Sequence, residues 1–347
     1  MGVTGPAATL PLVRRLALAS IVANVAIVVT GGTVRLTTSG LGCPTWPKCS
    51  EGSFVTTPEN GLHGYIEFGN RLLTFALAAV AVATLVAALR LRPRRRDLAL
   101  LALALFLGIP LQAVIGGLTV LTELNPWAVM LHLLCSMALI AVATLLHHRA
   151  GAGAQPAGLR VHILLRRLAL AVLGALAAVL YLGTVVTGSG PHAGDADARR
   201  TGLDPALVSQ LHADAALLLI GLSVALLVAL HATGAPEDVR RAAAVLVGVE
   251  LAQGTIGYTQ YFTGLPVALV NLHMLGAGLL VVAAARLVLV VRRPAGLLAE
   301  QQRIDPDGHE QHGQVSDRAV EQAHRPERRP VAAATRAQIE PVRLDEE

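Results

Sequence analysis

Polar and ionisable side chains inside otherwise apolar segments are the residues of this sequence that could do chemistry. Four of them recur, one in every second apolar segment: Asn70, His132, His212 and His273. Each falls about four to seven residues after its segment begins, which at about 1.5 Å per helical residue gives all four a similar depth. Because polar residues inside a membrane are costly and by default functional, this pattern predicts a layer of ligands.

His212 and His273 form the clearer pair, in the second half of the chain. Imidazoles from two helices of one bundle can clamp a heme iron from both sides. The alternative is a pair of interface histidines that hydrogen-bond to backbone or water. Matched depth in equivalent segments favours the heme interpretation.

The first half pairs His132 with Asn70, and an amide is a poor iron ligand. Glu67 precedes Asn70 by three residues and therefore lies on the same helical face. An acid beside an iron with an open position suits substrate chemistry. The competing interpretation is a structural ion pair between Glu67 and Arg71. His63, just outside this segment, is expected to be a solvated loop residue.

The segments that carry these residues are long and apolar enough to cross a membrane. Of 347 residues, 54% are hydrophobic and only 15% are charged, whereas soluble proteins have about 25% charged residues. A bilayer core of about 30 Å requires roughly 20 helical residues. The predicted spans are 14–33, 66–89, 98–121, 127–147, 163–187, 206–231, 239–261 and 266–291.

Arginines gather in alternate connections. They lie before the first span, between the second and third, between the fourth and fifth, at the start of the seventh and after the eighth. In the other connections basic and acidic residues nearly balance. The positive-inside rule therefore places both termini in the cytoplasm, in a cell membrane that we expect to be the bacterial cytoplasmic one. The arginines are not clustered with aromatics on one face, so no nucleic-acid partner is expected.

The two halves of the chain resemble each other at one offset of 141 residues (253 − 112 = 141): Gln112, Ile115, Gly116 and His132 match Gln253, Ile256, Gly257 and His273. With four spans each, both halves enter the membrane from the same side, as in a parallel repeat. The predicted fold is an all-α integral membrane protein of eight transmembrane helices, arranged as two pseudo-symmetric four-helix bundles. The predicted domains are residues 1–150, residues 151–293 and a disordered cytoplasmic tail, residues 294–347.

Two of the three cysteines, Cys43 and Cys49, lie in the first outer loop. An oxidising exterior and a short, proline-bent loop favour a disulfide there. A metal pair is the alternative, although the usual two-residue spacing and a second ligand pair are absent. Aromatic residues also gather near the outer ends, as in an interfacial belt: Trp46, Trp127, Tyr65, Tyr258, Tyr261 and Phe262.

These features resemble the heme A synthase family over about residues 14–292. The resemblance rests on the two repeats, the Cys43–Cys49 loop, the segment Gly61–Arg71 and the single histidine in the fourth, sixth and eighth spans. The family's most specific motif, Glu-x-x-His-Arg, reads Glu67-x-x-Asn70-Arg71 here. A second outer cysteine pair, which some members carry, is absent.

The resemblance implies an oxidoreductase that converts the C8 methyl group of heme O stepwise into a formyl group, giving heme A for cytochrome oxidase. It implies a heme b cofactor held by His212 and His273. Substrate heme O would lie at His132, with Asn70 and Arg71 beside it and the catalytic Glu67 near the oxidised methyl.

The implied partner is a membrane electron donor. Heme O synthase and cytochrome oxidase assembly factors are further candidates, and a homo-oligomer is left open. The rival functions are a quinol-linked bis-histidine electron-transfer cytochrome and a heme carrier without heme-modifying activity.

Overall fold

Eight long helices make up most of the structure, a computed structural model that describes residues 8–151 and 157–294. The helices are α1 (Leu10–Leu36), α2 (Gly61–Leu89), α3 (Arg96–Leu121), α4 (Pro126–Gly151), α5 (Ile163–Ser189), α6 (Pro205–Ala232), α7 (Glu237–Phe262) and α8 (Val267–Val290). The predicted helical fold is thereby confirmed. The predicted tail after Pro294 lies outside the described residues.

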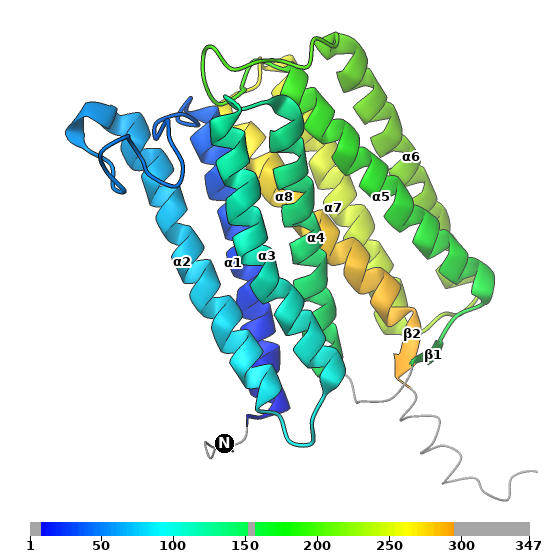
Figure 1. Cartoon of the computed structure of the whole chain (residues 1–347). Coiled ribbons are helices and arrows are strands. Elements are labelled where there is room, and N and C mark those ends of the chain that lie inside the picture. Colours follow the sequence, from blue (N-terminus) through cyan, green and yellow to red (C-terminus); the bar gives the residue numbers. More distant parts are fainter. Residues whose placement is uncertain (1–7, 152–156, 295–347) are drawn as a thin grey trace, which may run out of the picture. The chain divides into compact units, whose positions relative to one another are not determined.

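Three short elements accompany the helices. A 3₁₀ turn, η1 (Pro58–Asn60), leads directly into α2. The strands β1 (Ala157–Leu159) and β2 (Arg292–Pro294) pair in antiparallel fashion next to the α4–α5 connection and the end of α8 (Figure 1).

The helices α1 and α2 begin four and five residues before the predicted spans, and the other six begin within two residues of the prediction. Capping residues and prolines help to start the helices outside the apolar stretch. Thr9 Oγ1 accepts a hydrogen bond from the backbone N–H of Leu12 at 3.4 Å, and Asp204 Oδ1 accepts one from Ala206 at 2.9 Å. Pro205 occupies the first turn of α6, where a missing N–H leaves no hydrogen bond unmade. Hydropathy registers only the apolar part of each helix.

Seven of the eight helices are long and apolar enough to cross a membrane, among the residues that the structure describes. They fit a multi-pass membrane protein. The prediction of eight apolar spans was wrong for residues 239–261, which form α7 but do not reach the hydropathy of the others. The reason is its polar composition, which includes Glu250, Gln253 and Gln260.

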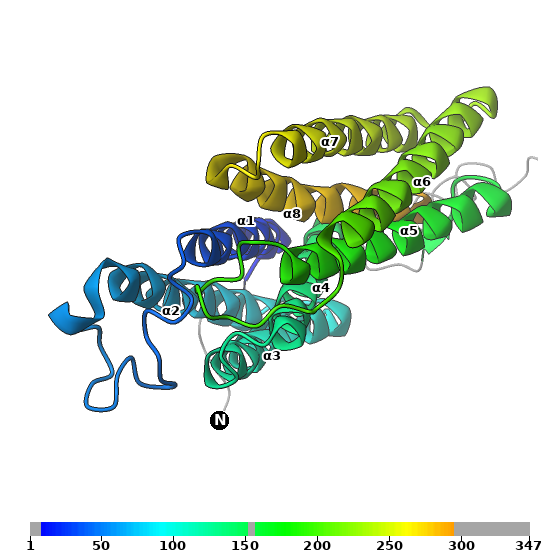
Figure 2. The ribbon, with the colours of Figure 1, turned by 90° about the horizontal axis from the view of Figure 1, so that it is seen from above.

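Helices of the same half pack around one another. The helix α1 contacts α2 and α4, and α3 contacts the same two helices. In the second half α5 contacts α6 and α8, and α7 contacts the same two helices. Figure 2 shows the two groups side by side. These contacts suit two four-helix units, whereas the pseudo-symmetry and the division near residue 150 stay predictions.

Small residues bring the halves together along α8, which packs on α1 and α4. A Cβ atom placed on Gly278 would lie 3.3 Å from Val25 and 3.7 Å from Ile140. Nearby, the Asn271 amide donates a hydrogen bond to Thr33 Oγ1 at 2.7 Å. Close packing at small residues and interhelical polar bonds are the usual means of helix association in membranes.

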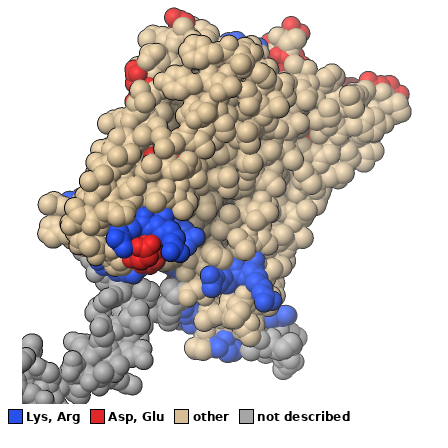
Figure 3. Space-filling view, turned by 180° about the vertical axis from the view of Figure 1, so that it is seen from behind, with Lys and Arg blue, Asp and Glu red and all other residues tan. Residues whose placement is uncertain are grey.

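Basic residues concentrate at one end of the helices. Figure 3 shows Lys and Arg gathered at the end where α1 begins, while most visible Asp and Glu lie at the opposite end. The arginines of this end include Arg14, Arg15, Arg90, Arg92, Arg94, Arg95, Arg96, Arg149, Arg160, Arg166 and Arg167. The placement of that end in the cytoplasm remains a prediction.

Replacing Gly278 with leucine should lower the free energy of unfolding by about 1–3 kcal/mol, because the new side chain overpacks the junction with Val25 and Ile140. Thermal unfolding of the purified protein in detergent measures this change. Gly248→Leu is the matched control, since nothing lies within 4 Å of a Cβ atom placed there. Equal stability of the two variants would contradict the described junction.

Candidate functional site

Each of the four predicted layer residues lies against a glycine of the preceding helix. The pairs are Gly31 with Asn70, Gly116 with His132, Gly183 with His212, and Gly257 with His273. A Cβ atom placed on each glycine would lie 3.8, 3.2, 3.0 and 3.4 Å, in that order, from the nearest side-chain atom of its partner. In all four cases, a polar side chain of an even-numbered helix packs on a glycine of the odd-numbered helix before it.

The structure brings His212 and His273 together from α6 and α8. Their ring centres are 6.5 Å apart and the ring planes are inclined at 77°. With metal–nitrogen bonds of about 2 Å, two imidazoles on one metal ion have ring centres roughly 6 Å apart. The spacing of this pair thus fits a shared metal ion.

A backbone carbonyl orients His212. Its Nδ1 lies 3.1 Å from the carbonyl oxygen of Val179 on α5, to which it donates a hydrogen bond. The other ring nitrogen, Nε2, is then the one left to accept a metal. Metal-bound histidines are commonly oriented by such a bond.

The histidines that match across the repeat, His132 and His273, share a further property. In each ring, Nδ1 is buried and has no hydrogen-bond partner among the described residues. Buried polar atoms are nearly always paired, so these two nitrogens lack the kind of partner that the Val179 carbonyl gives His212.

The donor set fits heme iron better than an ion held by protein ligands alone. Among residues 8–151 and 157–294, no three His, Cys, Asp or Glu side chains converge as a metal site would need. Structural zinc requires four such ligands. Two imidazoles suffice for heme iron because the macrocycle fills the other positions.

Asn70 differs from the three histidines because its amide is bonded to α1. Its Oδ1 accepts a hydrogen bond from Thr30 Oγ1 at 2.7 Å. Among the residues that the structure describes, no hydrogen bond joins Asn70 and His132. The first half therefore offers one imidazole where the second half offers two.

A glutamine of the odd-numbered helix lies beside His132. Gln112 Nε2 donates hydrogen bonds to the His132 carbonyl at 3.1 Å and to Ser136 Oγ. Its repeat partner, Gln253, lies so close to Gly276 on α8 that a Cβ atom there would overlap the amide. The matching glutamines were visible in the sequence, but their bonding was not.

The buried carboxylate of Glu67 is fully engaged. Arg71 donates to Oε1 from Nε at 3.1 Å and from Nη2 at 2.5 Å, and the backbone N–H of Cys43 donates to Oε2 at 2.6 Å. The structural ion pair, which competed with catalysis as an explanation of Glu67, is therefore present. The predicted catalytic role itself stays a prediction.

Arg71 also holds the first outer loop. Its guanidinium donates to the carbonyl oxygens of Cys43, Thr45 and Lys48 at 3.0–3.3 Å. The predicted disulfide between Cys43 and Cys49 is confirmed. The motif arginine thus ties the loop to α2.

His63 lies within the first turn of α2 and not in a loop, because α2 begins at Gly61. The side chain is exposed, as expected, yet its Nδ1 is 2.9 Å from Oγ of the buried Ser39. The hydrogen bond connects the start of α2 to the end of α1.

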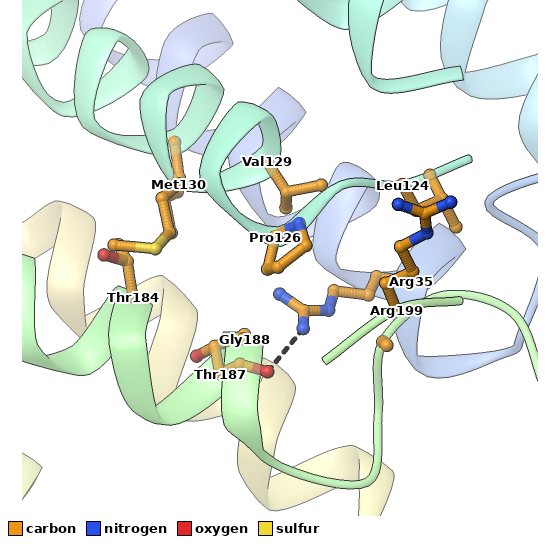
Figure 4. A pocket seen from close by; sticks show the side chains of 11 residues that line it. Arg35, Leu124, Pro126, Val129, Met130, Thr184, Thr187, Gly188 and Arg199 are labelled. Atoms are coloured by element: carbon orange, nitrogen blue, oxygen red, sulfur yellow. Dashed lines mark hydrogen bonds between the residues drawn. The ribbon is translucent and has the colours of Figure 1, made fainter. Parts of the chain in front are cut away.

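A pocket separate from the histidines lies where α4 and α5 meet (Figure 4). Arg35, from the last turn of α1, points into it and donates hydrogen bonds to the carbonyl oxygens of Thr187 and His192, both at 2.5 Å. None of the three layer histidines lines this pocket. Although Arg35 follows the first predicted span, it satisfies a carbonyl at the C-terminal end of α5.

The fold and the site together define a multi-pass helical membrane protein with internally repeated polar positions. Residues 14–285 match the COX15-CtaA family, described as a cytochrome oxidase assembly protein, and the chain therefore belongs to that family. This confirms the assignment to the heme A synthase family that the motifs indicated. A comparison with individually curated proteins finds no match.

Replacing Arg71 with glutamine should lower the free energy of unfolding by about 2–3 kcal/mol, because it leaves the buried Glu67 without its cation. The double variant Arg71→Gln/Glu67→Gln should recover part of the lost stability. A double-mutant cycle measured by thermal unfolding should give a coupling energy of about 1–3 kcal/mol.

The matched control is another Glu–Arg pair with the same spacing, Glu237 and Arg241, whose side chains are 63% and 75% exposed. Removing Arg241 should change stability by less than about 0.5 kcal/mol. Additive effects of the Glu67 and Arg71 substitutions would contradict the described ion pair.

Proposed function

We propose that this chain converts heme O into heme A by stepwise oxidation of the C8 methyl group to a formyl group. Membership of the COX15-CtaA family supports a role in cytochrome oxidase assembly and, at the level of the family, an oxidoreductase. The observation that carries the heme assignment is the spacing of His212 and His273, 6.5 Å between ring centres.

In this proposal the second half, residues 151–293, holds a heme b cofactor through His212 and His273. The Val179 carbonyl orients the His212 ring, and Gly183 and Gly257 leave space beside the two imidazoles. The heme, when bound, supplies electron-transfer chemistry, while the protein supplies ligation and orientation.

The first half, residues 1–150, would hold the substrate heme O at His132. The Gln112 bond to the His132 carbonyl fixes this turn of α4. Asn70 lies at the equivalent position of α2 but is bonded to Thr30, so the substrate iron would have one strong protein ligand. An iron with only one strong protein ligand suits a heme that must leave the site after it is oxidised.

Glu67 is the carboxylate that we propose to act in catalysis, close to the oxidised methyl. Its two oxygens are held by Arg71 and by the Cys43 N–H. As a carboxylate it could accept a proton during oxidation, with Arg71 and the disulfide loop holding it in place. Both termini would face the cytoplasm of a bacterium, and a membrane electron donor would serve the heme b site.

One observation favours an alternative function. Because the first half has a single imidazole and Asn70 is bonded to Thr30, the complete ligand pair lies in the second half alone. A quinol-linked electron-transfer cytochrome, or a heme carrier, would need no more than that pair. Measuring the product separates these functions.

Removing one proposed axial ligand tests the heme b site. The variant His273→Ala should lose the low-spin absorption spectrum and most of the bound heme b, because one imidazole cannot supply both axial ligands. Absorption spectra and heme content of the purified protein measure this. His231→Ala, at an exposed position of α6, is the control that should keep both. An unchanged spectrum in His273→Ala would overturn the assignment.

Co-expression in a strain that makes heme O but not heme A, followed by heme extraction and mass analysis, tests the reaction. We expect heme A or its hydroxylated precursor with the native chain. The variant Glu67→Gln keeps a hydrogen-bond acceptor for the Cys43 N–H and should retain heme b while losing at least about 99% of conversion.

Unchanged heme O beside a bound bis-histidine heme b would instead support the electron-transfer alternative. In that case Asn70→His, which restores the family motif, would show whether a second ligand is what the first half lacks. Full conversion by Glu67→Gln would remove Glu67 from the chemistry.

A further inference from the structure

Trp46 departs from the other aromatic residues near the outer helix ends. Trp127, Tyr65, Tyr258 and Tyr261 have exposed fractions of 51–53%, as an interfacial belt would require. Trp46 is only partly exposed, and its indole packs on Gly117 of α3 so closely that a Cβ atom there would overlap the ring.

The loop that carries Trp46 is held rigidly. The disulfide closes residues 43–49, with 4.3 Å between the terminal Cα atoms. Arg71 binds three carbonyl oxygens of this loop, including those of Thr45 and Lys48 on either side of Trp46. An indole on such a loop is pre-organised, because little conformational entropy is lost when a ligand contacts it.

The indole and the imidazole of the first-half site pack on successive residues of α3. Gly116 contacts His132, and the following residue, Gly117, contacts Trp46. Each glycine in a helix destabilises it by about 0.5–1 kcal/mol relative to alanine. Because consecutive helical residues point about 100° apart, the two consecutive glycines leave space for an imidazole and an indole on neighbouring faces of α3.

The second half lacks this arrangement. The residue that matches Gly117 at the offset of 141 is Tyr258 (117 + 141 = 258), which is 51% exposed and stacks on Phe262 instead. Gly257 contacts His273 there, but no indole lies beside it. The tryptophan therefore distinguishes the half proposed to bind the substrate from the half proposed to bind the resident cofactor.

We propose that Trp46 is a substrate-binding residue, whose indole would contact the planar macrocycle of a heme held by His132 and orient it. This inference rests on the proposed function and adds a residue to its substrate site. Aromatic faces in contact add about 0.5–1.5 kcal/mol beyond burial of their area. The loop and its disulfide then act as the support of this indole.

The test uses the purified full-length protein with heme b already bound, titrated with heme O and followed by absorbance. Trp46→Leu keeps apolar bulk but removes the ring, and should bind heme O roughly three- to tenfold more weakly. Trp46→Phe restores a ring and should recover part of this affinity. Gly117→Ala, which displaces the indole without removing it, should also weaken binding.

The control is Trp127→Leu, the other tryptophan of the chain, which should leave the affinity for heme O unchanged. In every variant the low-spin heme b spectrum and the Cys43–Cys49 disulfide, checked by peptide mass, report that the fold and the loop are intact. Equal heme O affinity in Trp46→Leu, with the loop intact, would overturn this inference alone. Failure of the native protein to bind heme O would overturn the proposed function with it.

Discussion

An imidazole inside an apolar helix bundle needs space for its ring and a partner for each of its nitrogens. In this protein the space comes from the neighbouring helix, where a glycine stands opposite each of the four layer positions. A larger residue there would push the helices apart or force the ring out of the bundle. The rest of the site depends on this close approach, because it sets the depth and the direction of every candidate ligand.

Around this constant arrangement the two halves have diverged in their polar partners. In the second half His212 is bonded to the Val179 carbonyl and faces His273. In the first half Asn70 is bonded to Thr30 and leaves His132 as the single imidazole. The difference lies in what the side chains bond to and not in how the helices pack. The proposed function, with a resident cofactor in the second half and a substrate in the first, would need such a difference.

The outer loop of the first half is organised by one ion pair. Glu67 is buried, and a buried carboxylate requires a cation and hydrogen-bond donors to stay charged. Arg71 supplies the charge, and the same guanidinium satisfies three loop carbonyls. Removing the acid would therefore disturb the loop, and removing the loop would expose the acid. A structural role and a chemical role for Glu67 are thus compatible.

The sequence by itself determined the helices, the repeat and the disulfide. Apolar runs of roughly 20 residues and a fixed offset of 141 residues are local or periodic signals, and Cys43 and Cys49 are only six residues apart. Hydropathy also predicted α7, as a span over residues 239–261, but this helix is too polar to count among the candidate membrane spans of the described residues. Hydropathy counts the polar residues of a helix but does not register whether they are buried. The burial of Glu250 and Gln253 depends on the neighbouring helices.

Only the tertiary structure decided which side chains meet. The bond of Arg35 to Thr187 joins residues 152 positions apart, and Trp46 of the first outer loop packs on Gly117 of α3. Neither contact has a pattern in the sequence, because each depends on how the helices and loops pack against one another. Helix formation follows from local hydrogen bonding and hydropathy, while the identity of each ligand's neighbour follows from packing over the whole bundle.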